Sequence, residues 1–112
     1  MSEERRVDKR HTLWLPLQVR QGEDVQMLAI SRNISATGVL VIVGASLEVG
    51  GRVELKLQVP GEDEEELGGE IIRVEVNEED PDGLWKYRLA VRFDEPVPHL
   101  IPTFERLESV SA

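Results

Sequence analysis

The sequence predicts a small, mainly all-β domain, and three observations support this. Apolar residues recur mostly at every second position, which is the period of a strand with one buried face. Turn-forming stretches interrupt these segments about every eight to twelve residues, a spacing typical of antiparallel barrels. The chain has 112 residues, enough for one hydrophobic core. We therefore expect a small six-stranded antiparallel β-barrel with a short C-terminal helix.

The first two strands are predicted from alternating apolar residues. The first spans residues 13–19, where leucine or valine occupies every second position. Pro16 lacks a backbone N–H, so this strand should lie at an edge or contain a bulge. Residues 21–24 (Gln-Gly-Glu-Asp) then form a turn, and residues 25–31 form the second strand.

The next two strands differ in their apolar pattern. Residues 33–38 break the second strand, and a largely β-branched run at residues 39–43 predicts the third. A turn at residues 45–51 precedes the cleanest alternation in the chain, over residues 53–59. Pro60 and Gly61 end that strand.

The remaining strands flank two polar turns. Residues 62–66 are all acidic and should form a solvated hairpin tip. Residues 71–76 form the fifth strand, residues 77–83 the next turn, and residues 84–93 the last strand. Closure of the six strands into a barrel would remove exposed sheet edges.

A short helix is expected at residues 100–110. Leu100, Phe104 and Leu107 fall on one face of it, and Pro102 lies in its first turn. We expect residues 1–11 to be a flexible arginine-rich arm and residues 12–112 a single β-barrel domain.

The charge of the chain is distributed unevenly. Its formal net charge is −9, and eleven of its 22 acidic residues lie within residues 62–82. Residues 5–10, in contrast, carry four cations and one anion. The acidic total argues against binding of a nucleic-acid polymer, but the basic cluster can still hold a small anion.

Other classes of protein are disfavoured by what the chain lacks. It has no cysteine, and His11 and His99 lie near opposite ends without a carboxylate at a recognisable spacing, so we expect no enzyme and no metal site. We interpret His11 as a surface residue.

A longest apolar run of nine residues and a charged N-terminus predict a cytoplasmic protein without membrane insertion. A nucleic-acid-binding barrel would need aromatics along a basic stripe, and the chain has only five aromatics.

Arg6 and Arg10 are separated by three residues, with Arg5 adjoining and Lys9 between them. Arginine makes bidentate contacts to phosphate, stacks on aromatic bases and pairs with the O6/N7 edge of guanine. By itself the spacing also fits a charged terminal tail.

A second motif lies between the second and third predicted strands. In Asn33-Ile34-Ser35-Ala36-Thr37-Gly38, Asn33 and Ser35 can both donate and accept hydrogen bonds. Gly38 permits a positive φ or the close approach of a ligand. By itself this motif also fits an ordinary turn.

Together and in this order, the two motifs resemble those of the PilZ domain family of bacterial cyclic di-GMP receptors. Arg-x-x-x-Arg matches residues 6–10, and Asp/Asn-x-Ser-x-x-Gly matches residues 33–38. The resemblance covers nearly the whole chain, including its length, strand order and final strand. Thr37 stands where the family often has a glycine, and so does Ala90 in the last strand.

The resemblance implies a ligand, a site and a mechanism. The ligand would be cyclic di-GMP, no other cofactor is implied, and the arginine arm would fold across the mouth of the barrel when the ligand binds. An arginine at the position of Arg5 is associated in this family with binding of a stacked ligand pair. The implied ligand-binding residues are Arg5, Arg6, Arg10, Asn33, Ser35 and Gly38.

The resemblance also implies a downstream protein partner, in motility, exopolysaccharide synthesis and biofilm formation, or transcription. The alternative is a PilZ-like adaptor that binds a protein without nucleotide. An exposed apolar patch on the barrel or the terminal helix would favour that alternative.

Overall fold

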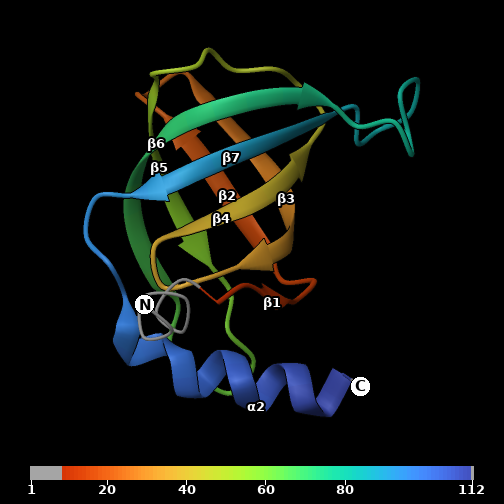
Figure 1. The fold of residues 1–112 in the computed structure, drawn as a ribbon. Coiled ribbons are helices and arrows are strands. Elements are labelled where there is room, and N and C mark those ends of the chain that lie inside the picture. Colours follow the sequence, from red (N-terminus) through yellow and green to blue (C-terminus); the bar gives the residue numbers. More distant parts are fainter. Residues whose placement is uncertain (1–8, 112) are drawn as a thin grey trace.

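The chain folds into a closed antiparallel β-barrel with a helix across one end (Figure 1), in a computed structural model that describes residues 9–111. Six strands follow one another around the barrel in the order β3-β2-β5-β6-β7-β4, and pairing of β4 with β3 closes it. A seventh, two-residue strand, β1, pairs with the end of β3. The strands are β1 (His11–Thr12), β2 (Pro16–Gln21), β3 (Val25–Ile34), β4 (Gly38–Val43), β5 (Arg52–Leu57), β6 (Glu65–Val76) and β7 (Tyr87–Phe93). The predicted six-stranded barrel is confirmed.

The predicted apolar alternation produces the core. The leucine and valine side chains at positions 13, 15, 17 and 19, and those at positions 53, 55, 57 and 59, are all at most 6% exposed. Side chains from β3, β4, β6 and β7 complete this single cluster. Because the strands alternate, the intervening residues form the outer wall of the barrel, where a ligand or partner can reach them.

The first predicted strand is divided into β1 and β2, and Ser31 bridges the break. Strand β2 pairs with β3 on one side and β5 on the other in continuous register, so the prediction that it lies at an edge or contains a bulge is wrong. Pro16 is tolerated because it is the first residue of β2, where no backbone N–H is needed for the ladder. The buried Ser31 hydroxyl accepts a hydrogen bond from Leu15 N (2.9 Å) and donates one to Leu13 O (2.5 Å). One side chain thus satisfies the backbone where the strand is interrupted.

Other strand boundaries also differ from the prediction. Strand β3 continues through Asn33 to Ile34, so the expected break begins later. Glu65 and Glu66 belong to β6 and pair with β5, so the acidic hairpin tip is shorter than expected. The last strand begins at Tyr87, and residues 84–86 precede it. In each case cross-strand pairing, which the local sequence does not reveal, determines where the strand begins or ends.

The C-terminal helix covers the end of the barrel at which β1 lies (Figure 1). A single 3₁₀ turn, η1 (Pro98–Leu100), leads into α2 (Ile101–Ser111), with Pro102 in its first turn as predicted. Phe104 is fully buried and closes the core. Within residues 9–111, no helix is both long enough and apolar enough to cross a membrane.

A hydrogen-bonded clasp joins α2 to β1. His11 is only 1% exposed, so its interpretation as a surface residue is wrong. Its Nδ1 lies 3.0 Å from Glu108 Oε1, and its ring contacts Phe104 at a centroid distance of 5.8 Å. Glu108 Oε2 also accepts a hydrogen bond from Thr12 N (2.9 Å), and these two hydrogen bonds hold the Glu108 pKa below its ordinary value. The clasp fixes the residues that immediately follow Arg10.

Candidate ligand-binding site

A hollow lies on the outer wall of the barrel over β3, β4, β7 and β6, and it contains part of both motifs. None of the described residues that line it is acidic, although the protein carries an excess of acidic residues. The hollow is lined by Arg10, Asn33, Thr37, Gly38, Val39, Leu40, Ile72, Arg73, Ala90, Val91 and Arg92. Its charge therefore suits an anion.

Arg10 and Asn33 connect the two motifs directly. The Arg10 guanidinium donates a hydrogen bond from Nη1 to Asn33 Oδ1 at 2.9 Å. Arg10 is exposed and Asn33 half-buried, so the pair lies at the rim of the hollow. Residues 23 positions apart in the sequence thus converge on one place.

Asn33 faces outward because of a β-bulge. The pairing of β3 with β4 shifts register between Ser31 and Asn33, so Arg32 is an extra residue. Ser31 points inward and is fully buried, and strict alternation would turn Asn33 inward as well. The bulge returns Asn33 to the outer face, which is a common use of a bulge near a functional site.

Ser35 organises the turn that follows Asn33. Its side chain is fully buried, and Oγ accepts hydrogen bonds from Thr37 N (3.2 Å) and Gly38 N (3.3 Å). Its own N–H donates to Gly38 O at 2.9 Å. The hydroxyl therefore holds the turn in shape beneath the rim, and it lies next to the hollow without lining it.

Gly38 is required by packing between strands. Its φ is not positive, so the backbone conformation of this residue does not explain why a glycine is present. A Cβ at this position would lie 2.5 Å from the backbone oxygen of Val91 in β7. The backbone that approaches Gly38 closely is therefore that of the neighbouring strand. The missing side chain lets β4 and β7 pair at the floor of the hollow.

Two departures from the family pattern also line the hollow. Thr37 lies on the turn, and Ala90 lies on β7 opposite Leu40 of β4. Both positions therefore lie within the hollow itself.

Eight of the lining residues were not among the predicted site residues, and Ile72, Arg73 and Arg92 are the three that follow neither motif and matched no family position. Arg73 and Arg92 are exposed, with Arg73 Nε 3.3 Å from Glu75 Oε1 and Arg92 Nη2 3.2 Å from Glu70 Oε1. Arg73 stands out in the sequence as the single base of the acidic segment 62–82. Their convergence on the hollow depends on strand register, which no local motif records.

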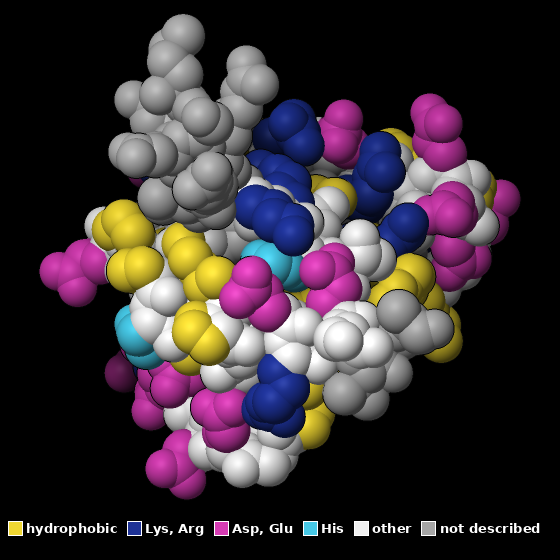
Figure 2. Space-filling view, turned by 60° about the horizontal axis from the view of Figure 1, so that its bottom comes forward, with side chains coloured by type: hydrophobic (Ala, Val, Ile, Leu, Met, Phe, Trp, Pro, Cys, Tyr) yellow, Lys and Arg dark blue, Asp and Glu magenta, His cyan; other side chains and the backbone are white. Residues whose placement is uncertain are grey.

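Arg5 and Arg6, and most of the predicted arm at residues 1–11, lie outside the described residues. Figure 2 shows the end of the molecule that α2 covers. Most of the Lys and Arg side chains visible on this face gather in one area, and acidic side chains are scattered over the rest of the face.

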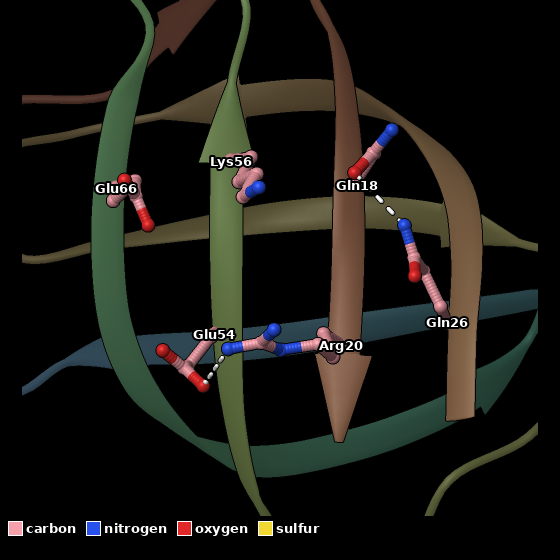
Figure 3. Close-up of a pocket in the computed structure, with 6 residues that line it drawn as sticks. All are labelled: Gln18, Arg20, Gln26, Glu54, Lys56 and Glu66. Atoms are coloured by element: carbon pink, nitrogen blue, oxygen red, sulfur yellow. Dashed lines mark hydrogen bonds and ion pairs between the residues drawn. The ribbon is translucent and has the colours of Figure 1, made fainter. Parts of the chain in front are cut away.

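A second hollow, on the opposite wall, offers less to an anion (Figure 3). It lies over β2, β3, β5 and β6, and two of its charged side chains, Arg20 and Glu54, pair with each other. Arg20 Nη2 lies 2.6 Å from Glu54 Oε1, a contact that raises the Arg20 pKa, and Gln26 Nε2 donates to Gln18 Oε1 at 3.0 Å. Glu66 adds a further negative charge to its lining.

The histidines have carboxylate partners that their sequence spacing does not reveal. His11 pairs with Glu108, and His99 Nε2 lies 3.7 Å from Glu65 Oε1. Over residues 9–111, no group of three His, Asp or Glu side chains is placed to hold a metal ion.

Comparisons with known proteins identify the family. The family model for the PilZ domain matches residues 4–107. Among solved structures, the PilZ domain of YcgR from Escherichia coli with c-di-GMP matches with a TM-score of 0.63 and 16% identity, over 95% of this chain and 88% of that one. The PilZ domain of CeSA from a cellulose-synthesizing bacterium matches with a TM-score of 0.60 and 18% identity, over 92% and 98%.

A longer protein shares the same fold. The inhibitor of motility MotI/DgrA of Bacillus subtilis matches with a TM-score of 0.62 and 20% identity, over 90% of this chain and 46% of that one. This chain thus spans about half of its length. No curated protein matches the sequence. The barrel, the hollow that contains part of both motifs, and a family match over nearly the whole sequence lead to one conclusion: this chain belongs to the PilZ domain family.

Proposed function

We propose that this chain is a receptor for cyclic di-GMP that orders its N-terminal arginine arm when the ligand binds and relays the signal to a protein partner. The observation that carries the proposal is the 2.9 Å hydrogen bond between Arg10 and Asn33. It brings the two motifs together at the rim of a hollow without acidic lining residues. YcgR, whose PilZ domain was solved with c-di-GMP, shares this fold.

The chemistry of the site fits the chemistry of the ligand. Cyclic di-GMP carries two phosphates and two guanines, and arginine binds both kinds of group with paired hydrogen bonds. Arg10 would exchange its neutral partner Asn33 for a phosphate or a guanine edge, a stronger, charge-assisted contact where the acceptor is an anion. Asn33 would then be free to hydrogen-bond a guanine.

Ser35 and Gly38 would shape the site from below. The Ser35 hydroxyl accepts two backbone hydrogen bonds and donates its proton to Gly38 O at 3.4 Å, so it would contact a phosphate only in exchange for that long hydrogen bond. Gly38 leaves the floor of the hollow without a side chain. Arg5 and Arg6 would reach the ligand from the arm and close over it.

Signal output would come from the ordering of the arm. The arm enters the barrel at β1, beside α2, so its position would determine what a partner meets at this end of the molecule. The proposed partner is a cytoplasmic protein that controls motility, as the inhibitor of motility that shares this fold does, or biofilm formation. We propose no catalytic activity, since the site would bind its ligand and leave it unchanged.

Titration calorimetry with cyclic di-GMP tests the proposal. Wild type should bind, and Arg6→Ala, Arg10→Ala and Asn33→Ala should each weaken binding. Loss of one charge-assisted contact costs about 1.5–3 kcal/mol, or roughly tenfold to hundredfold in affinity. Arg20→Ala is the matched control, because Arg20 is an exposed, paired arginine on the opposite wall. Equal affinities for the wild type and all four variants would contradict this assignment of the site.

The alternative function is a PilZ-like adaptor that binds a protein without nucleotide. The exposed apolar side chains available to such a partner include Leu28, Val76 and Leu84, which are 68%, 53% and 80% exposed. A stable complex with a partner, unchanged by saturating cyclic di-GMP and abolished by Leu84→Ser, would support this alternative.

A further inference from the structure

A second β-bulge lies on β6, on the side of the hollow far from Arg10. The pairing of β6 with β7 runs from Ile71 opposite Val91 to Arg73 opposite Ala90, which leaves Ile72 as an extra residue. Ile71 is fully buried, while Ile72 and Arg73 are both exposed. Without the bulge, alternation would turn Arg73 toward the core.

The two bulges place polar residues at the two ends of one row across the sheet. Cross-strand pairing joins Asn33 to Leu40, Leu40 to Ala90, and Ala90 to Arg73. The row crosses three strand spacings, or about 14 Å. The first bulge turns Asn33 outward beside Arg10, and the second turns Arg73 outward. The ends of the row are therefore polar and its middle is apolar.

We propose that Arg73, together with Arg92, forms a second cationic wall of the ligand site, opposite Arg10, and contacts the second phosphate or guanine of the ligand. This inference rests on the proposed function and adds two residues that neither motif contains. Arg92 lies on β7 between Gly38 of β4 and Glu70 of β6, so it borders the turn motif, and it lines the same hollow as Arg73.

Both arginines are available for such a contact. The side chains of Arg73 and Arg92 are 60% and 63% exposed, and their carboxylate partners Glu75 and Glu70 are also solvent-accessible. Exposed ion pairs contribute little to stability, so a phosphate can replace the carboxylate at little cost. Between the two walls, Leu40 and Ala90 offer an apolar surface on which a base can lie.

The separation of the walls determines the kind of ligand. Arginines at opposite ends of a row of about 14 Å reach different groups of a bound molecule. A ligand with two anionic groups would use both walls, whereas a mononucleotide would use one. The second wall therefore selects for a dinucleotide.

Titration of the whole chain with cyclic di-GMP tests the second wall. Arg73→Gln and Arg92→Gln should each weaken binding roughly tenfold or more, and Arg73→Lys should restore part of the loss because it keeps the charge. Arg20→Gln, on the opposite wall, should stay within twofold of wild type. Unchanged circular dichroism and melting temperature would show that the exposed substitutions leave the barrel folded.

The outcomes separate this inference from the proposed function. If wild type binds and Arg73→Gln and Arg92→Gln bind as tightly as Arg20→Gln, the second wall is wrong and the receptor function stands. If wild type itself binds no cyclic di-GMP, both are wrong. Weakening by Arg73→Gln or Arg92→Gln with little effect of Arg20→Gln supports the second wall.

Discussion

At the scale of single residues, Ser31 shows how one hydroxyl supports an irregular strand. It makes two buried hydrogen bonds where Pro16 begins β2. Ser31→Ala should lower the free energy of unfolding by about 2–4 kcal/mol, because it leaves a buried N–H and a buried C=O unpaired. Urea denaturation measures this change. Ser46→Ala, at an exposed position, should change it by less than about 0.5 kcal/mol; equal effects would contradict the assigned role of Ser31.

Gly38 gives a second prediction at this scale. A methyl group there would meet the Val91 carbonyl at 2.5 Å, and backbone cannot move aside easily. Gly38→Ala should destabilise the barrel by roughly 1–3 kcal/mol. It should also weaken cyclic di-GMP binding, since β4 and β7 together form the floor of the hollow. Thermal unfolding and calorimetry measure the two effects, and wild-type stability in this variant would rule out the packing explanation.

The sequence predicts residues well where their role is local or carried by a motif. It identifies Arg10, Asn33, Ser35 and Gly38 as a group, and the structure places all four at or beside one hollow. It does not predict that Ser31 bridges the break between β1 and β2, or that Arg73 and Arg92 line the hollow. Their roles follow from strands distant in the sequence, and a bulge leaves no local signal.

At the scale of secondary-structure elements, the clasp between α2 and β1 predicts a dependence on pH. Hydrogen bonds from His11 and Thr12 lower the Glu108 pKa from its ordinary value of 4.5. A carboxyl group whose pKa is lower in the folded state stabilises the fold above its ordinary pKa and loses this effect as the pH falls. The stabilising effect of Glu108 should therefore be present at neutral pH and decline below about pH 4.5.

Chemical denaturation from pH 3 to pH 7 tests the clasp. Glu108→Gln should be less stable than wild type at pH 7, and the difference should shrink toward pH 3. Glu108→Ala should cost about 1–2 kcal/mol at pH 7, since the buried His11 loses its partner. Glu105→Gln, an exposed change on the same helix, is the control. A difference that stays constant with pH would show that the Glu108 carboxylate does not act in this way.

Strand alternation and helix periodicity predict most of the elements, because each follows from which face is buried. The helix prediction at residues 100–110 is within one residue of α2 at both ends. The clearest errors are at ends of strands: β6 begins at Glu65, well before the predicted start at residue 71, and the predictions also miss the end of β3 and the start of β7. Pairing with β1 and β4 extends β3, and the local composition of residues 33–38 gives no sign of these partners.

At the scale of the whole molecule, the charge distribution reconciles an acidic protein with an anionic ligand. The net charge is −9, but the lining of the hollow carries three arginines and no acid among the described residues. Binding of cyclic di-GMP should weaken several-fold between about 0.05 and 0.5 M NaCl, since salt screens exposed charges. Calorimetry at several salt concentrations measures this. An affinity that is independent of salt would argue against binding by the arginines.

Backbone NMR during a titration with cyclic di-GMP tests the central claim most directly. We predict shifts at Arg10 and residues 33–38, and at residues 72–73 and Arg92, with the opposite wall around Gln18 and Arg20 unchanged. Shifts on both sides of the hollow would locate the ligand between the two walls. An unchanged spectrum at saturating cyclic di-GMP, or shifts confined to β2 and β5, would contradict the account.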